Sequence, residues 1–176
     1  MLFLLITSSP YLPTHLLSDA AWYTRQQIHY KEVSMPDYTV RYAQKDDIPL
    51  LKEVDEWPKD EAWQRKIDAS EVVVAVAENP TVIAGHLRFS VLWSTVPFLG
   101  LIFVAPEHRG KGLSRRLLEF LTAELKEHGY VALLSSSQTD EPEPQRWHVH
   151  MGFHTNGIIE HIADDNVGEL VYRKML

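Results

Sequence analysis

The apolar residues of this chain follow two periods, and the shorter period predicts strands. Apolar and polar side chains alternate over Tyr38–Ala43, and nearly continuous apolar runs occupy Glu71–Ala77, Val82–Trp93 and Val96–Val104. Short turns separate the last three segments, so we expect them to pair as an antiparallel meander. Gly85 lies inside the second of these segments and predicts a bulge or a close approach of a neighbouring backbone.

The longer period predicts helices. Leu113, Leu117, Leu121 and Leu125 recur at every fourth position and mark one buried stripe of a helix over about Gly112–His128. Three shorter helices are expected as well: one capped by Asp46 or Asp47 with Pro49 in its first turn, one over Lys59–Ile67, and one over Glu143–Met151.

Three further segments complete the order of elements. Tyr130–Ser136 has the pattern of a strand, and a right-handed crossover would place it parallel to Val96–Val104. Phe153–His161 and Glu169–Lys174 are expected to form a closing hairpin. The chain therefore runs strand, two helices, three antiparallel strands, helix, strand, helix and two strands, which is an α/β arrangement.

The first 34 residues do not continue this pattern. The chain has 176 residues, a length that suits one domain with a single core. We expect residues 35–176 to form that domain, and residues 1–34 to be an N-terminal extension that is flexible or not native. A docked N-terminal arm is the alternative, in which Ser18 would cap a short helix over Asp19–Tyr30. Leu2–Ile6 is too short for the apolar core of a signal peptide.

Charge and cysteine content exclude several classes of function. The net charge of -7 argues against sequence-independent nucleic-acid binding and favours a small or cationic partner. The chain has no cysteine, which excludes disulfides, thiolate metal sites and a cysteine acyl-enzyme, and which is compatible with a cytoplasmic location. No apolar run approaches the length of a membrane span, so no membrane partner is expected.

The loop between the strand Val96–Val104 and the long helix carries the chemistry of an anion site. Arg109, Gly110, Lys111 and Gly112 combine cationic side chains with glycines, whose backbone N–H groups can close around an anion. The helix that follows adds unpaired N–H donors and its positive dipole end, which suits a phosphate. The spacing matches neither the dinucleotide fingerprint nor the P-loop.

The spacing Arg109-x-x-Gly112-x-Ser114 resembles the pyrophosphate loop of the GCN5-related N-acetyltransferase (GNAT) family, although Ser114 stands where that family usually has Gly or Ala. The order of elements from about Tyr38 to the C-terminus and the segment Gln145–Phe153 resemble that family too. The resemblance implies the acyl-CoA N-acyltransferase fold, in which a mixed, mostly antiparallel sheet carries helices on both faces.

The resemblance also implies where acetyl-CoA would bind. Backbone groups of Ile102 and Val104 would pair with its pantetheine arm, and the N–H of Val104 would face the developing oxyanion. Amides of the loop and of the first helical turn would hold the pyrophosphate. The expected acetyl-CoA-binding residues are Ile102, Phe103, Val104, Arg109, Gly110, Lys111, Gly112, Leu113, Ser114, Arg115 and Gln138.

His148 stands where the family often has a tyrosine that protonates the leaving thiolate. An imidazole can act as an acid near neutral pH, so His148 is the expected catalytic acid, with a structural histidine as the alternative reading. Tyr130 and Tyr172 are weaker alternates. We name Glu141 as the expected base, while Glu143, Glu56, His86 and a water relay stay open. Trp93, Glu56 and Trp147 are the expected acceptor-binding residues.

The function that these features favour is acetyl transfer from acetyl-CoA to a primary amine by direct attack in a ternary complex, because no cysteine can form a thioester intermediate. A non-catalytic acyl-CoA-binding or regulatory module of the same fold is the alternative, and a nucleotide-binding protein is a third reading. The acceptor would be a small amine or a peptide, and a homodimer is left open. No metal site is expected, because His148, His150 and His154 do not share one helix face and no carboxylate completes a set.

Overall fold

The structure is a computed structural model that describes residues 33–35, 38–56, 58–78, 81–161 and 167–176. The helix expected over Asp19–Tyr30 lies outside these residues. Within the described ranges, the chain folds into one sheet that is flanked by helices.

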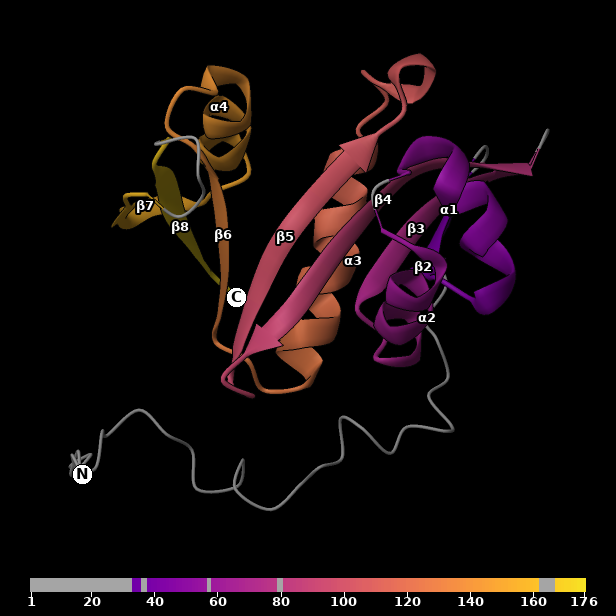
Figure 1. Ribbon diagram of the computed structural model, residues 1–176, viewed down its shortest axis with the longest axis horizontal. Coiled ribbons are helices and arrows are strands. Elements are labelled where there is room, and N and C mark those ends of the chain that lie inside the picture. The colour runs from indigo at the N-terminus through magenta and orange to yellow at the C-terminus, as the bar shows by residue number, and fades with distance from the viewer. Residues whose placement is uncertain (1–32, 36–37, 57, 79–80, 162–166) are drawn as a thin grey trace.

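The described strands form one sheet in the order β1-β2-β3-β4-β5-β6-β8-β7 (Figure 1). Neighbouring strands pair antiparallel except β5 and β6, which run parallel. The mixed, mostly antiparallel sheet is therefore confirmed, and so is the parallel crossover. The strands are β1 (Val33–Met35), β2 (Tyr38–Tyr42), β3 (Val72–Glu78), β4 (Thr81–Leu92), β5 (Val96–Val104), β6 (Ala132–Gln138), β7 (His154–Ile159) and β8 (Glu169–Met175).

Strand β1 was not expected from the sequence. Its residues Val33, Ser34 and Met35 pair with Val40, Thr39 and Tyr38 of β2. The expected boundary between an N-terminal extension and the domain falls inside this strand. The division of the chain at residue 35 stays a prediction.

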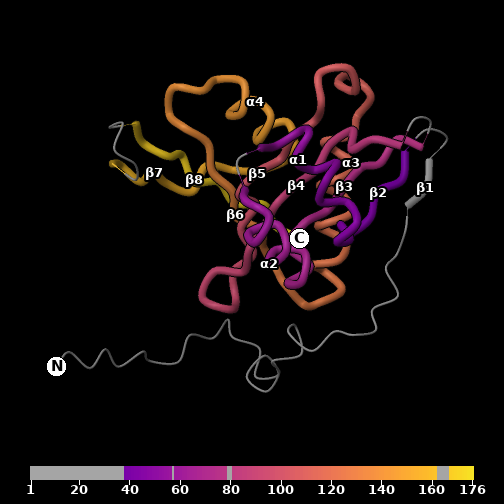
Figure 2. Tube along the Cα trace, turned by 45° about the vertical axis from the view of Figure 1, so that its right-hand side comes forward, coloured from indigo at the N-terminus to yellow at the C-terminus, as the bar shows by residue number. Residues whose placement is uncertain are grey.

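Four α-helices flank the sheet in the described part of the chain, and the bounds of the three for which a range was expected differ from it by one residue at each end. They are α1 (Ile48–Val54), α2 (Asp60–Asp68), α3 (Leu113–Glu127) and α4 (Pro142–His150). α3 packs on one face of the sheet, and α1 and α2 pack on the other (Figures 1 and 2). The prediction of helices on both faces is confirmed.

β3 shows why its sequence is an unbroken apolar run. Val73 and Ala75 belong to the core under α3, whereas Val72 and Val74 belong to the core under α1 and α2. Because side chains alternate between the faces of a sheet, a strand covered on both faces needs apolar residues at every position. Burial of each large side chain contributes about 1.5–3 kcal/mol to folding.

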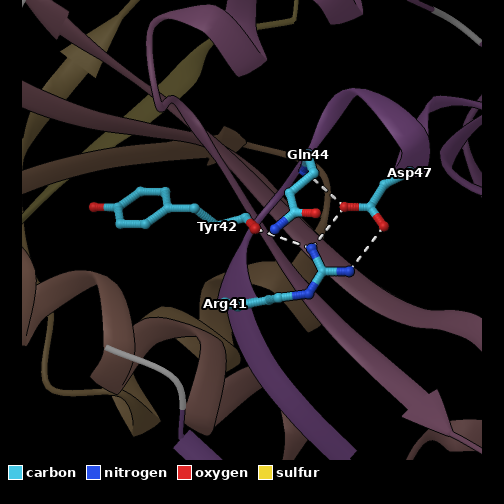
Figure 3. Close-up of polar contacts among 4 residues, drawn as sticks. All are labelled: Arg41, Tyr42, Gln44 and Asp47. Carbon is cyan, nitrogen blue, oxygen red and sulfur yellow. Dashed lines mark hydrogen bonds and ion pairs between the residues drawn. The ribbon is translucent and has the colours of Figure 1, made fainter. Parts of the chain in front are cut away.

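The predicted helix cap at Asp46 or Asp47 is wrong in its detail. Asp47 occupies the N-cap position of α1 but makes no side-chain capping bond to it. Its carboxylate instead accepts two hydrogen bonds from Arg41, at 2.7 and 2.9 Å, and one from the backbone N–H of Gln44 at 2.7 Å (Figure 3). A bidentate guanidinium pair is stronger than a neutral cap, which explains why the carboxylate turns toward β2.

Gly85 lies at a bulge, as the sequence predicted. The pairing of β3 with β4 shifts register between Ala75 and Val76, which face Gly85 and Ile83. A Cβ atom built on Gly85 would lie 2.7 Å from the carbonyl oxygen of Phe103. Any side chain at this position would therefore force β4 and β5 apart near the C-terminal end of β5.

The parallel pair β5–β6 is very short. Only Phe98 with Leu134 and Leu99 with Ser135 are in register, and beyond them the two strands diverge (Figure 1). The last part of β5 thus keeps its pairing with β4 but has no described strand on its other edge. This divergence opens the sheet at the end that leads into the glycine loop.

Candidate active site

A cleft of about 740 Å³ lies between the diverging strands. Leu99–Val104 of β5 form one wall, and Ser135–Gln138 of β6 form the other. The glycine loop and the start of α3 close one end, and residues of α4 cover the side. The cleft brings together two stretches that are apart in sequence, residues 99–114 and 135–148, around one opening.

The backbone of β5 alternates between β4 and the cleft. Ala105 N–H donates to Ala84 O of the neighbouring strand at 3.0 Å, so Phe103, two residues earlier, also directs its backbone toward β4. Ile102 and Val104 then direct their N–H and C=O groups into the cleft. Arg109 Nε, which donates to Val104 O at 3.0 Å, agrees with this orientation. An extended ligand could pair with Ile102 and Val104 as a strand would.

The loop at the end of the cleft presents several backbone donors. Gly110 and Gly112 have φ angles of 74° and 75°, which side-chain-bearing residues rarely adopt. Gly112 precedes α3, and Arg116 N–H makes a helical bond to Gly112 O at 3.2 Å. The N–H groups of Leu113, Ser114 and Arg115 belong to the first helical turn, which has no earlier carbonyls to bond.

Two expected ligands in the loop direct their side chains elsewhere. Lys111 Nζ donates to Tyr38 Oη at 2.8 Å, and Arg115 Nη2 lies 3.1 Å from His150 Nε2. Neither residue lines the cleft, whereas Arg109, Gly110, Gly112, Leu113 and Ser114 do. Lys111 and Arg115 therefore contribute charge near the loop rather than direct side-chain contacts within the cleft.

Ser114 and Trp147 connect the loop to α4. The indole Nε1 of Trp147 donates to Ser114 Oγ at 3.2 Å, and both residues line the cleft. The hydroxyl that distinguishes Ser114 from the family pattern is thus an acceptor for Trp147. Trp147, expected at the acceptor, lies at the loop end of the cleft.

His148 is buried at the junction of α4, β5 and β6, with 5% of its surface exposed. Its Nδ1 lies 2.8 Å from Pro144 O and its Nε2 lies 2.8 Å from Ser135 Oγ. The ring stacks on Tyr172, with centroids 4.2 Å apart and planes inclined by 3°. Burial lowers the pKa of His148, although the bond to the carbonyl of Pro144 acts in the opposite direction.

The hydrogen bonds around His148 fix where its protons lie. Pro144 O can only accept, so Nδ1 carries a hydrogen and Nε2 of the neutral ring is bare. Ser135 has one hydrogen, which can go to His148 Nε2 or to Leu99 O, 2.9 Å away. When the ring is protonated, Nε2 donates to Ser135 and Ser135 donates to Leu99. The hydroxyl of Ser135 therefore connects His148 Nε2 to the wall of the cleft by hydrogen bonds.

Only some of the candidate bases lie at the cleft. Glu141 and Glu143 line the cleft, where Glu169 joins them. Glu56 is exposed and lies outside the residues that line the cleft. His86 is fully buried with its Nε2 3.2 Å from Asp55 Oδ2, and burial lowers its pKa to about 4, which makes it a weak base at neutral pH.

Two more expected residues lie apart from each other, because Gln138 is the last residue of β6 and Trp93 precedes β5. Gln138 lines the cleft, and its carbonyl accepts from Gln145 Nε2 at 3.1 Å. Trp93 is 82% exposed at the turn before β5, whereas the glycine loop follows the end of that strand. The structure does not bring Trp93 to the cleft. Its prediction rested on residue type alone, which carries no information on which end of a strand faces the site.

Ser135 and His108, for which the sequence predicted no role, both line the cleft. The signal for Ser135 was a run of serines inside an otherwise apolar strand. A small polar residue in a buried strand indicates a hydrogen-bonded site. His108 precedes Arg109 and carried no signal, because its partner Tyr38 is 70 residues away.

The described residues contain no group of three or more His, Cys, Asp or Glu side chains arranged to hold a metal ion. In the same part of the chain, no helix combines the length and the apolar character that a membrane crossing requires.

Comparisons with known proteins agree with this geometry. The model of the Acetyltransferase (GNAT) family matches residues 31–153. Ard1 from Thermoplasma volcanium superposes with a TM-score of 0.70 at 14% identity, over 80% of this chain and 98% of that one. A GNAT family acetyltransferase from Elizabethkingia anophelis with acetyl-CoA bound gives 0.62 at 15% identity, over 81% and 100%.

Nourseothricin acetyltransferase is similar over a shorter region. It superposes with a TM-score of 0.54 at 26% identity, and the match covers 59% of this chain and 64% of that one. No curated protein matches the chain in sequence.

Proposed function

The chain belongs to the GNAT acetyltransferase family, and we propose that it transfers the acetyl group of acetyl-CoA to a primary amine by direct attack in a ternary complex. The observation that carries this proposal is the cleft between β5 and β6, into which Ile102 and Val104 direct their backbone groups. The reaction forms a C–N bond, breaks the C–S bond of the thioester, moves a proton from the amine and gives one to the thiolate.

The β5 wall would hold the acyl end of acetyl-CoA. Ile102 would pair with the pantetheine arm as a missing strand would, because its backbone faces the cleft and has no described strand beside it. Val104 N–H would donate to the thioester carbonyl oxygen, whose negative charge grows during attack. A donor fixed before the reaction stabilises such charge without reorganising.

The glycine loop would hold the pyrophosphate. N–H groups of Gly110 and Gly112 and of the first turn of α3, together with the positive end of that helix, favour an anion at this point. Arg109 adds a positive charge at the rim. The fit rests on the two glycines, which have positive φ angles and no neighbouring atom within 4 Å of the place that a Cβ atom would occupy.

We propose that His148 supplies the proton for the leaving thiolate through Ser135. His148 donates from Nε2 to Ser135 Oγ, and Ser135 passes its own hydrogen to the sulfur. The low pKa of His148 makes its cation scarce at neutral pH but a stronger acid when it forms. This assigns to the His148–Ser135 pair the role that a tyrosine on α4 has in related proteins.

We propose Glu141 as the group that accepts the proton of the amine. It lines the cleft at the start of α4, and Glu143 and Glu169 line the cleft with it. Three carboxylates beside one opening favour a cationic acceptor over an anionic one. The absence of cysteine is compatible with action in the reducing cytoplasm.

The test is release of free CoA thiol from acetyl-CoA in the presence of amines. The panel would include nourseothricin, whose acetyltransferase is similar in fold, together with polyamines and peptides with a free N-terminus. Acetylated amine in step with released thiol is expected for at least one of these acceptors. An acyl-CoA-binding module would instead bind acetyl-CoA tightly in calorimetry and release no thiol with any of them.

A further inference from the structure

His108 lines the cleft beside the glycine loop and is tied to the start of the domain. It ends a 3₁₀ turn, Pro106–His108, directly before Arg109. Its Nδ1 lies 3.0 Å from the hydroxyl of Tyr38, the first residue of β2, and the two rings meet edge to face. Lys111 donates to the same hydroxyl at 2.8 Å. Tyr38 thus binds two residues of the loop at once.

This chain of hydrogen bonds has a direction. Lys111 Nζ can only donate, so Tyr38 Oη accepts from Lys111. The hydroxyl has one hydrogen to give, and His108 Nδ1 is its one possible acceptor among the described residues, so Tyr38 donates to the neutral ring. Neutral His108 then carries its hydrogen on Nε2. The other neutral tautomer would leave the hydrogen of Tyr38, which is 7% exposed, without an acceptor among the described residues.

The bond between His108 and Tyr38 reverses its direction when His108 is charged, but Nε2 stays a donor. In the imidazolium form Nδ1–H donates to Tyr38, and Nε2 still carries a hydrogen. Nε2 is therefore a donor in both protonation states, and among the described residues it has no partner. The ring is partly exposed, so a ligand of the cleft can reach it.

We propose that His108 is a phosphate-binding residue, whose Nε2–H donates to a phosphate of the bound CoA. The inference rests on the proposed function, because it takes the cleft as the CoA site. Tyr38 and Lys111 are positioning residues, which hold the ring and keep its hydrogen on Nε2. The ammonium of Lys111 acts through Tyr38 and His108.

Calorimetric titration of the full chain with CoA tests the proposal. We expect His108→Ala to weaken CoA binding by about tenfold or more, as for loss of one hydrogen bond to a charged group. His108→Gln should recover part of the affinity, because its amide can donate. Tyr38→Phe keeps the ring contact and removes the hydroxyl, and it should give an intermediate loss. The matched control is His154→Ala on β7, which lies outside the cleft and should bind CoA as the unaltered chain does.

Two further ligands identify the phosphate. If the loss in His108→Ala disappears with 3′-dephospho-CoA, the 3′-phosphate is the partner, and if it persists, the pyrophosphate is the partner. Pantetheine, which has no phosphate, should bind both chains equally by NMR titration. A folded His108→Ala chain that binds CoA as the unaltered chain does, or that loses pantetheine affinity to the same extent, overturns the proposal.

A second measurement does not depend on a variant that folds. In ¹⁵N-histidine spectra of the unaltered chain, His108 should show a bare Nδ1 and a protonated Nε2 at high pH, and its Nε2–H resonance should move when CoA is added. A hydrogen on Nδ1 alone would overturn the proposal. If the unaltered chain does not bind CoA at all, both the proposed function and this inference are wrong. If it binds CoA but the resonances of His108 do not respond, only this inference is wrong.

Discussion

The imidazole Nε2 of His148 lies 2.8 Å from the hydroxyl of Ser135, on the wall of the cleft where β5 and β6 separate. Because Nδ1 is held by the carbonyl of Pro144, we expect proton exchange between the ring and the cleft to pass through Ser135. The two residues would act together in one proton path, so the effects of substituting them on the rate should not be additive.

We expect Ser135→Ala and His148→Phe each to lower kcat by about 10²-fold while the affinity for acetyl-CoA stays nearly constant, as for general acid–base groups. The double variant should lose little more than either single one, because both substitutions interrupt the same proton path. His148→Tyr should retain more activity than His148→Phe. Steady-state kinetics with the acceptor found in the thiol-release assay measure these values.

A rate for His148→Phe within a few-fold of the unaltered chain would assign His148 a structural role. Losses that multiply in the double variant would show that the two residues act separately. Urea unfolding of each variant accompanies the kinetics, because His148 also stacks on Tyr172 and helps to hold α4 on the sheet.

Gly112 offers a test of the loop. Its φ of 75° and its place before α3 predict that Gly112→Asp strongly weakens acetyl-CoA binding, because the new carboxylate meets the pyrophosphate. Gly112→Asn is the matched control, since it has nearly the same shape and tolerates this backbone conformation equally well. Calorimetry should show a much larger loss for Asp than for Asn, and equal losses would argue against a pyrophosphate at this position.

The elements that the sequence predicted well are those that a local pattern determines. The leucine stripe of α3 and the doubly buried run of β3 each appear within a few residues of the expected range. The glycine loop followed from spacing, because a backbone that needs positive φ restricts the residue type. β1 was not predicted, because three residues are too few to show a period.

The parts that sequence could not supply depend on contacts between distant residues. Nothing in the sequence around Asp47 indicates that its carboxylate forms an ion pair with Arg41 of β2. Ser135 and His148 meet only because β6 and α4 fold onto one side of the cleft, and Trp93 and Trp147 could be told apart only after the ends of β5 were known. Residue type suggested chemistry at each of these positions, but topology decided which side chains share the site.

The first strand provides a test of the domain boundary. A chain that begins at Met35 loses Val33 and Ser34, which pair with β2 at the edge of the sheet. The cleft lies between β5 and β6, separated from β1 by β2, β3 and β4. We therefore expect this shortened chain to lose some stability and to keep acetyl-CoA binding. A chain beginning at Lys31, which retains β1, is the control, and loss of binding by a folded chain from Met35 would show that residues 1–34 belong to the domain.

Stability should fall as the pH is lowered, because His86 is buried and uncharged. Its pKa is about 4 in the folded chain, compared with 6.5 for an ordinary histidine. Between these values the unfolded chain binds a proton and the folded chain does not, so the free energy of unfolding decreases as the pH falls from 6.5 to about 4. At about 1.4 kcal/mol per pH unit, the full loss is about 3 kcal/mol.

Urea unfolding between pH 7.5 and 5 measures the part of this loss that lies above the range in which most carboxylates titrate, about 2 kcal/mol. In His86→Gln, which can still donate to Asp55, the slope should be smaller over the same range. Burial also lowers the pKa of His148, which leaves a residual slope of the same sign. An unchanged slope in His86→Gln would mean that His86 takes up its proton without unfolding.

Gly85 and Gly100 form a matched pair for testing how tightly β4 and β5 pack beside the cleft. A Cβ atom at Gly85 would lie 2.7 Å from Phe103 O, whereas one at Gly100 would be 3.8 Å from Arg88 O. Because Phe103 O is a backbone atom, it can move only with its strand, so we expect Gly85→Ala to destabilise the chain by about 1–3 kcal/mol. Gly100→Ala should have a much smaller effect. Urea unfolding at pH 7.5 distinguishes the two, and equal changes would mean that β4 and β5 can separate at Gly85 without cost.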